Sequence, residues 1–497
     1  MNRLNTACAL VLSVAVQLAV AADPPAAPLG DLPIGSEGFT ADVGFAAAGS
    51  AIVDYHDADA VWSEPVRTLA DAAGGYWVLG FVRPNTGNDQ FAITHLLADG
   101  TPDAAYGVNG QRIVTIAAVQ IQDATMDAAG NFYVAAVTNG DGADYSVECF
   151  GNDGTACAGF GLGGQTQVPF DQGGPNDDVA RRILIRDGSI YLLGDVDTPS
   201  NSGPWNVAVG IAKLDLASGA LDASFGNVDG LPGRAVYNID LVADGDDYSG
   251  DFAFSPDGRR LIAAGSSVAS DATSGISLEY AYVLGIDPAS GQLDADFGDA
   301  GQRIVPFDVG ESIGQFLGKD VIVRQNGRIV VLGDYWHDID GTVNPEVALI
   351  QLTAAGDLDA GFGNAGVATN LPGYMVETLA VAERPGAGDL VVTLEVDGLF
   401  PGDSTDHQQA LLDVSANGRT VRSEIEQTFP SNGINTGPRA RPVGVLVDAQ
   451  NRTLMWGWRN REFQTQPQLI LDRDITVSRF IDTDTVFGNG FGGVYAD

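Results

Sequence analysis

Histidine is the side chain most often used for acid–base and metal chemistry, and this chain has four of them, His56, His95, His337 and His407. No two are spaced as shared metal ligands. The sequence also lacks a GxSxG nucleophile elbow, an HExxH pair and a phosphate-binding P-loop. The stretch GFGLGG at 159–164 has glycines like those of a dinucleotide-binding turn, but short predicted strands flank it instead of a strand and a helix. The common catalytic and cofactor signatures are therefore absent.

Seven connecting segments that all differ in sequence hold the best candidates for binding. They mix tryptophan and tyrosine with aspartate, a combination that suits a carbohydrate, and their carboxylate oxygens also suit calcium. DIDG at 338–341 is only a fragment of a calcium-binding loop, and solvated polar loops are the simpler interpretation. The candidates are Trp62, Trp205, Asp246, Asp247, Trp336, His337, Asp338, Asp340, Trp458 and Arg459.

Two cysteines stand eight residues apart in the segment CFGNDGTAC, at Cys149 and Cys157. A metal site needs about four ligands, and no histidine lies near these residues in the sequence. We therefore expect them to form a disulfide in an oxidising compartment.

The first 22 residues have the features of a secretory signal peptide. Arg3 precedes an apolar run at 7–20, which ends in the small-residue pattern Ala19-Val20-Ala21. A membrane anchor is the alternative, but the run is shorter than the roughly 20 residues that span a bilayer. We expect a linker at 23–38 and a protein that is secreted or periplasmic, with association at the cell surface as a further option.

The charge of the chain limits its partners. Its 65 acidic residues outnumber 25 basic ones, for a net charge of −40. Such a chain repels nucleic acid and anionic membrane surfaces. No later apolar stretch is long enough to span a membrane. We expect a monomer that binds a carbohydrate or a protein partner.

Two sequence elements recur along the chain and indicate a repeat architecture. The first is an aspartate followed by an aromatic-glycine pair, and the second is a glycine-bearing hairpin followed by an apolar strand, which occurs seven times. Examples of the first are LDASFGNVDG at 221–230, LDADFGDAG at 293–301 and LDAGFGNAG at 358–366, and examples of the second are RDGSIYLLG at 186–194 and RQNGRIVVLG at 324–333.

Each repeat holds four short predicted strands, which predicts an all-β protein folded as a seven-bladed β-propeller over 39–487, with a tail at 488–497. Because strands alternate in direction within a blade, the two repeated turns must emerge on one face and the variable loops on the other. We interpret the repeated aspartates of the aromatic-glycine turns as acceptors of backbone N–H bonds, and the aromatic residues as wedges between blades. These are Asp222, Asp294 and Asp359, and Phe225, Phe297 and Phe362.

The LDxxFGxxG element followed by a DGxIxxxG hairpin, with a period near sixty residues, resembles the bacterial delta-60 repeat. The resemblance covers roughly 40–490. It implies an exported protein of β-propeller type whose function is generally unassigned.

Three functions remain open from the sequence. We favour a non-enzymatic binding or surface scaffold that uses the variable loops. The alternative is an extracytoplasmic lyase or hydrolase in the central funnel, which needs converging acids with a histidine or arginine, for example Asp338, His337 and Arg459. The third is a purely structural repeat domain. The sequence assigns no catalytic residue and no cofactor. Calcium is the one ion that the residues of the variable loops suit.

Overall fold

The computed structural model describes most of the chain after residue 38. The described residues are 39–55, 62–84, 86–139, 142–200, 205–226, 230–239, 241–243, 245–269, 277–306, 313–339, 342–369, 375–397, 407–419, 421–427, 440–465 and 468–482. The expected signal peptide, linker and C-terminal tail lie outside them, as does Asp340. The described part contains 29 strands and no helix.

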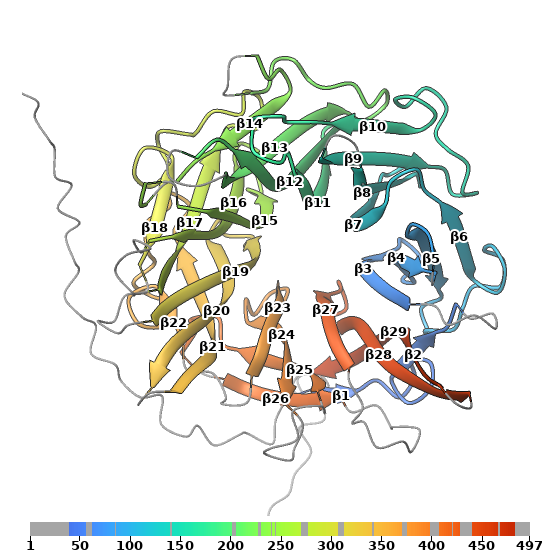
Figure 1. The fold of residues 1–497 in the computed structure, drawn as a ribbon. Coiled ribbons are helices and arrows are strands. Elements are labelled where there is room, and N and C mark those ends of the chain that lie inside the picture. The colour runs from blue at the N-terminus through green and yellow to red at the C-terminus, as the bar shows by residue number, and fades with distance from the viewer. Residues whose placement is uncertain are drawn as a thin grey trace, which may run out of the picture.

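The strands form seven antiparallel blades around one axis, which confirms the predicted propeller (Figure 1). The first strand of each blade borders the central opening. These inner strands are β3 (Trp62–Ala70), β7 (Gln120–Met126), β11 (Val179–Arg186), β15 (Asp247–Phe254), β19 (Ile313–Val323), β23 (Met375–Glu383) and β27 (Ala440–Val447).

The other strands follow outward in chain order. The second strands are β4 (Tyr76–Arg83), β8 (Phe132–Asn139), β12 (Ser189–Thr198), β16 (Leu261–Val268), β20 (Ile329–Ile339), β24 (Leu390–Asp397) and β28 (Thr453–Thr465). The third are β5 (Gln90–Leu96), β9 (Ala143–Phe150), β13 (Asn206–Asp215), β17 (Ser277–Ile286), β21 (Thr342–Leu352), β25 (His407–Val414) and β29 (Gln468–Asp482). The outer ones are β6 (Gln111–Thr115), β10 (Gln165–Val168), β14 (Arg234–Tyr237), β18 (Gln302–Val305), β22 (Val367–Ala368) and β26 (Val421–Gln427).

The seventh blade joins the two ends of the described chain. Its outer positions are filled by β1 (Phe39–Ala41) and β2 (Ser50–Val53), which both pair antiparallel with β29. Arg479 of β29 donates to Asp42 at 2.8 Å, and its guanidinium lies over the ring of Phe45. Because these contacts join the N-terminal and C-terminal segments within the seventh blade, they close the ring.

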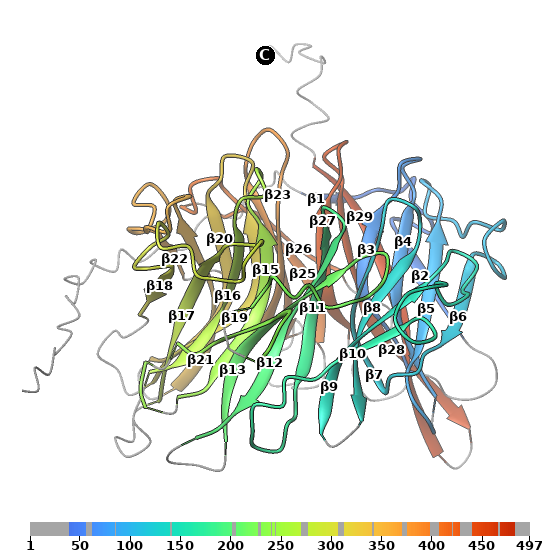
Figure 2. The same ribbon diagram turned by 90° about the horizontal axis from the view of Figure 1, so that it is seen from above.

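The strands run between the two faces of the ring (Figure 2). The connections from first to second strand and from third to fourth strand emerge on one face, which we call the turn face. The connections from second to third strand, and from each blade to the next, emerge on the opposite face, which we call the loop face. This arrangement follows from the antiparallel order of the strands.

The repeated aromatic residue packs between blades, as the sequence predicts. Phe225, Phe297 and Phe362 are all buried. Each ring lies against a glycine in the next blade, and a side chain at Gly291 would stand 3.1 Å from the Phe225 ring. Gly291 also has a φ of 74°, which a residue with a side chain rarely adopts. The aromatic-glycine contact therefore explains why both residues recur in the repeat.

The predicted turn aspartates and the predicted disulfide are both present. Asp222, Asp294 and Asp359 each accept a backbone N–H from two residues later, at 2.9–3.0 Å. Cys149 and Cys157 form an intrachain disulfide with their Cα atoms 5.3 Å apart. Both features stabilise turns that lie away from the inner strands. They therefore stabilise the blades and are not part of a site on the axis.

Candidate functional site

The candidates predicted from the sequence lie toward the loop face but in separate groups. Trp62 begins β3, Trp205 precedes β13, Asp246 precedes β15 and Asp247 begins it. Trp336, His337 and Asp338 lie in the last part of β20, and Trp458 and Arg459 lie in β28. For His337 and Asp338 only the backbone is described. The structure therefore does not show the meeting of Asp338, His337 and Arg459 that the enzyme alternative suggested.

One group lies where the seventh blade meets the first. The guanidinium of Arg473 is held between the rings of Trp62 and Trp458, 3.9 Å from each ring centre, and it forms an ion pair with Glu64. Burial lowers the pKa of Arg473 to about 10, so the group stays charged at neutral pH. Arg459 donates to the buried Asp474 at 3.1 Å. The contacts of Arg473 hold the seventh and first blades together, and the Arg459–Asp474 pair joins two strands of the seventh blade.

A second group lies between the third and fourth blades and has exposed aromatic side chains. Trp205 and Tyr248 are 47% and 39% exposed. Asp246 accepts hydrogen bonds from the Tyr248 hydroxyl at 3.1 Å and from the Val207 amide at 3.0 Å. Asp247 is fully buried and accepts the Ile239 amide at 2.7 Å, so its role is structural.

The sequence reasoning missed the charged residues that meet on the axis. The inner strands of the first five blades each carry a charged residue at the same position. In each of these strands a one-residue bulge interrupts the pairing with the second strand of the same blade, and the charged residue comes directly after it. A bulge turns the next side chain to a new direction. We call these residues the axial cluster: Arg67, Asp123, Arg182, Asp251 and Asp320.

A sequence signal for this cluster exists. Each member stands four residues before the first residue of its hairpin turn, as Asp123 does before Asp127 and Asp320 before Arg324. The sixth and seventh blades have Ala380 and Gly444 at this position, and neither side chain is charged. Aligning the seven hairpins at this position would have exposed the pattern.

Two of the five members of the axial cluster form an internal ion pair. Arg67 binds Asp123 through two hydrogen bonds, with the Nε to Oδ1 bond at 3.0 Å. Asp123 is 2% exposed and also accepts the amides of Ala124 at 2.8 Å and Ile183 at 3.1 Å. Ile183 belongs to the next blade. With all these partners, Asp123 serves mainly to hold two inner strands together.

The remaining three members are Arg182, Asp251 and Asp320. The carboxyl groups of Asp251 and Asp320 are neighbours across the fourth and fifth blades, close enough for Asp320 to affect the titration of Asp251. Burial is the main cause that raises the pKa of Asp251 well above its ordinary range, and the neighbouring Asp320 raises this pKa further while Arg182 opposes the shift. Burial and the second carboxyl therefore favour the protonated form of Asp251 more than in an exposed aspartate.

Two glycines allow the carboxyl groups of Asp251 and Asp320 to meet. A Cβ atom at Gly250 would lie 2.9 Å from the Ala264 carbonyl oxygen and 2.9 Å from that of Gly318. A Cβ at Gly318 would lie 2.8 Å from the Cα of Gly265. No side chain fits there, so the inner strands of the two blades approach closely just before each aspartate.

Solvent reaches the axial cluster. The side chain of Arg182 is 35% exposed and that of Asp251 is 19% exposed. Oδ1 of Asp251 accepts the Phe252 amide at 2.7 Å, and Oδ2 of Asp320 accepts the Val381 amide at 2.7 Å. One oxygen of each carboxyl is therefore fixed by a backbone amide.

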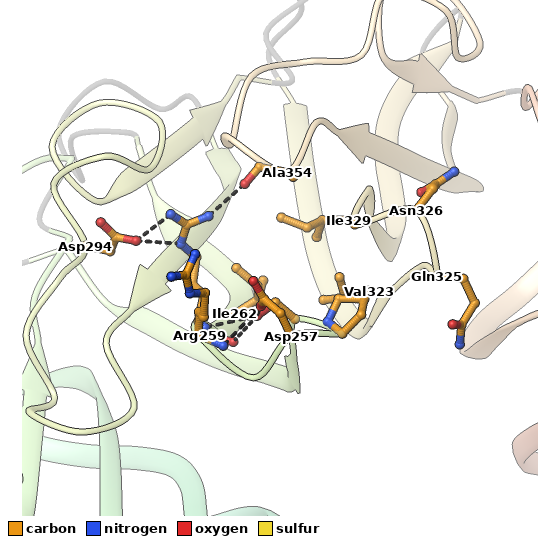
Figure 3. A pocket seen from close by; sticks show the side chains of 13 residues that line it. Asp257, Arg259, Ile262, Asp294, Val323, Gln325, Asn326, Ile329 and Ala354 are labelled. Carbon is orange, nitrogen blue, oxygen red and sulfur yellow. Dashed lines mark hydrogen bonds and ion pairs between the residues drawn. The ribbon is translucent and has the colours of Figure 1, made fainter.

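Two cavities that the structure describes lie on the turn face. One, of about 460 Å³, lies between the hairpins of the fourth and fifth blades, where Arg260 bonds Asp294 and the Ala354 carbonyl beside an apolar floor at Ile262 and Ile329 (Figure 3). The other, of about 1040 Å³, lies among the fifth, sixth and seventh blades. Neither is lined by a member of the axial cluster.

Metal and membrane features are absent from the part of the chain that the structure describes. No three His, Cys, Asp or Glu side chains within the described ranges are arranged to hold a metal ion. None of the described segments forms a helix that is long and apolar enough to cross a membrane.

Comparisons with known proteins show similarity of fold. No model of a known protein family matches the chain, and no curated protein matches it. Among solved structures, an ulvan lyase of polysaccharide lyase family PL25 shares 9% identity over 86% of this chain and 95% of its own, with a TM-score of 0.43. The GH93 α-L-arabinofuranosidase of Fusarium graminearum shares 10% identity over 86% and 97%, with a TM-score of 0.36. The aldose sugar dehydrogenase from Streptomyces coelicolor shares 14% over 74% and 96%, with a TM-score of 0.35. We draw no functional conclusion from similarities of this size.

Proposed function

We propose that the protein is an extracytoplasmic hydrolase that acts on a carbohydrate, with its acid–base pair on the propeller axis. The observation that carries the proposal is the placement of Asp251 and Asp320 at the same register of two closely approaching inner strands, where burial and Asp320 raise the pKa of Asp251. Two neighbouring carboxyls, one of which favours its protonated form, are an arrangement that general acid–base catalysis can use. The disulfide and the expected signal peptide support a location outside the cytoplasm.

The roles of the two aspartates follow from their surroundings. Asp251 would give a proton to the leaving oxygen, because burial favours its protonated form. Asp320 would accept a proton from a water molecule held beside the pair. Most glycosidases separate their two acids by roughly 5 Å or more, whereas these two carboxyls are neighbours. The pair therefore fits a dyad that acts on one water molecule from the same side.

Carbohydrate is the substrate class that the loop face supports. Trp205 and Tyr248 expose aromatic rings beside the carboxylate of Asp246. The same observation favours a second function, a non-enzymatic scaffold that binds carbohydrate on the loop face without cleaving it. In that case the axial cluster would only hold the blades together.

Incubation of the purified mature protein with a panel of neutral and acidic polysaccharides separates these functions. We expect new reducing ends from at least one polysaccharide, without an unsaturated product. Unsaturated ends would identify a lyase instead of a hydrolase. Binding on a glycan array without cleavage of any polysaccharide in the panel would contradict the hydrolase and support the scaffold.

A further inference from the structure

Arg182 lies farther from its nearest carboxylate than the neighbouring basic residues Arg181 and Lys319 do. Arg181 donates to Asp195 at 2.8 Å, and Lys319 lies 2.7 Å from Glu377. Arg182 approaches only Asp251, with 3.5 Å between Nε and Oδ1. The remaining bond that the structure shows for its guanidinium joins Nη1 to the backbone oxygen of Arg181 at 3.2 Å.

This contact balances the charge of Arg182 only weakly. The 3.5 Å between Nε and Oδ1 is longer than a charge-assisted hydrogen bond, and burial and the nearby Asp320 raise the pKa of Asp251 and so favour its neutral form. The Arg182 side chain is 35% exposed, and its Nη2 has no partner among the residues that the structure describes. The Arg182 guanidinium therefore has N–H groups available to bind a ligand.

We propose that Arg182 binds an anionic group of the substrate, either the carboxylate of a uronic acid or a sulfate ester, beside the acid pair. This inference rests on the proposed function, because it places that group next to the Asp251–Asp320 pair. A guanidinium presents two parallel N–H donors, which match the two oxygens of a carboxylate or sulfate. The substrate class is then an acidic polysaccharide.

The large negative charge of the chain does not prevent this binding. Charges farther away than about 8 Å are largely screened at physiological salt. The inner strands are close to charge balance, with six basic and seven acidic side chains, whereas the whole chain has 25 and 65. An anion that reaches the axis therefore meets a local field unlike that of the outer surface.

Calorimetric binding to the Asp251→Asn protein tests the inference without turnover. The probes are a galacturonate trisaccharide, its neutral methyl ester and a sulfated galactose trisaccharide. We expect at least one anionic probe to bind about tenfold or more tighter than the methyl ester. The two anionic probes identify whether carboxylate or sulfate is preferred.

Arg182→Gln and Arg181→Gln form a matched pair, because the two residues are adjacent and only Arg182 faces Asp251. Arg182→Gln should abolish the preference for the anionic probe, and Arg181→Gln should retain it. Equal binding of charged and neutral probes, no binding of any probe, or a preference unchanged in Arg182→Gln would overturn the inference. If the protein cleaved a neutral polysaccharide in those cases, the proposed hydrolase activity would still stand. If the anionic probe were preferred through Arg182 but no polysaccharide were cleaved, only the proposed hydrolase activity would be contradicted.

Discussion

The carboxyl groups of Asp251 and Asp320 are neighbours on the propeller axis although they come from the inner strands of different blades. Their neighbour Asp123 occupies the same register but binds Arg67 and two backbone amides. One repeated position therefore supports two different roles. In the second blade it joins strands, and in the fourth and fifth it brings two carboxyl groups together.

The first prediction separates these two roles by stability. Asp123→Asn should lower the free energy of unfolding by about 2–3 kcal/mol, because it removes a buried partner of Arg67. Asp251→Asn should lower it by less than about 1 kcal/mol, because the raised pKa of Asp251 favours a neutral group at this position and the amide oxygen of asparagine can still accept the Phe252 N–H. Denaturant unfolding measures both. Equal losses would show that Asp251 is a structural residue like Asp123.

The second prediction concerns the close approach at Gly250. Gly250→Ala should cost about 1–3 kcal/mol, because its Cβ would lie 2.9 Å from two carbonyl oxygens and would push the fourth and fifth blades apart. Gly151→Ala is the control, since its nearest atom is the carboxylate oxygen of the exposed Asp153 side chain at 3.2 Å. The melting temperature should fall in the first variant only. A Gly250→Ala protein as stable as the control would contradict the close approach.

The third prediction distinguishes two of the tryptophans on the loop face. Trp62→Ala should destabilise the protein by about 1–3 kcal/mol, because it removes one side of the enclosure around Arg473. Trp205→Ala should change stability by no more than about 0.5 kcal/mol, since Trp205 is 47% exposed. Loss of carbohydrate binding in Trp205→Ala at unchanged stability would identify it as a ligand contact. Similar losses of stability in both variants would refute this assignment.

The fourth prediction follows from Asp178, whose carboxyl is fully buried between the second and third blades. Burial raises its pKa to about 6, although the amides of Phe170 and Asp197 oppose the shift. Between about pH 4 and 6 the folded protein therefore holds this proton more tightly than the unfolded chain. The contribution of Asp178 to stability is fully present below pH 4 and is lost as pH rises toward and past 6.

Unfolding free energies of the wild type and of Asp178→Asn, measured from pH 4 to 8, check this contribution. The variant cannot titrate at this position, so the difference between the two curves should change between about pH 4 and 6 and be constant above about 7. A constant difference over the whole range would show that Asp178 keeps an ordinary pKa in the folded protein.

The sequence was sufficient for the fold because the features that define it are local. Hairpin glycines, aromatic-glycine turns and apolar strands recur along the chain, and strand alternation places the two kinds of connection on opposite faces. The disulfide was predictable for the same reason, since Cys149 and Cys157 are separated by only eight positions.

The axial cluster was not recognised because it depends on two features that no single repeat shows. A bulge in each inner strand decides which side chain faces the axis, and ring closure decides which blades are neighbours. Asp251 and Asp320 each look like an ordinary strand residue in the sequence. Trp62 and Arg459 were chosen for their residue types, whereas the structure gives both of them partners that join the seventh blade to the first or stabilise it.

The rate of polysaccharide cleavage by the wild type and by Asp251→Asn, at equal protein concentration and neutral pH, tests the account most directly. We predict that Asp251→Asn retains the melting temperature of the wild type and loses at least about 100-fold in rate, since general acid–base catalysis contributes about that much or more. A folded Asp251→Asn protein that cleaves as fast as the wild type would contradict the catalytic role of the axial pair.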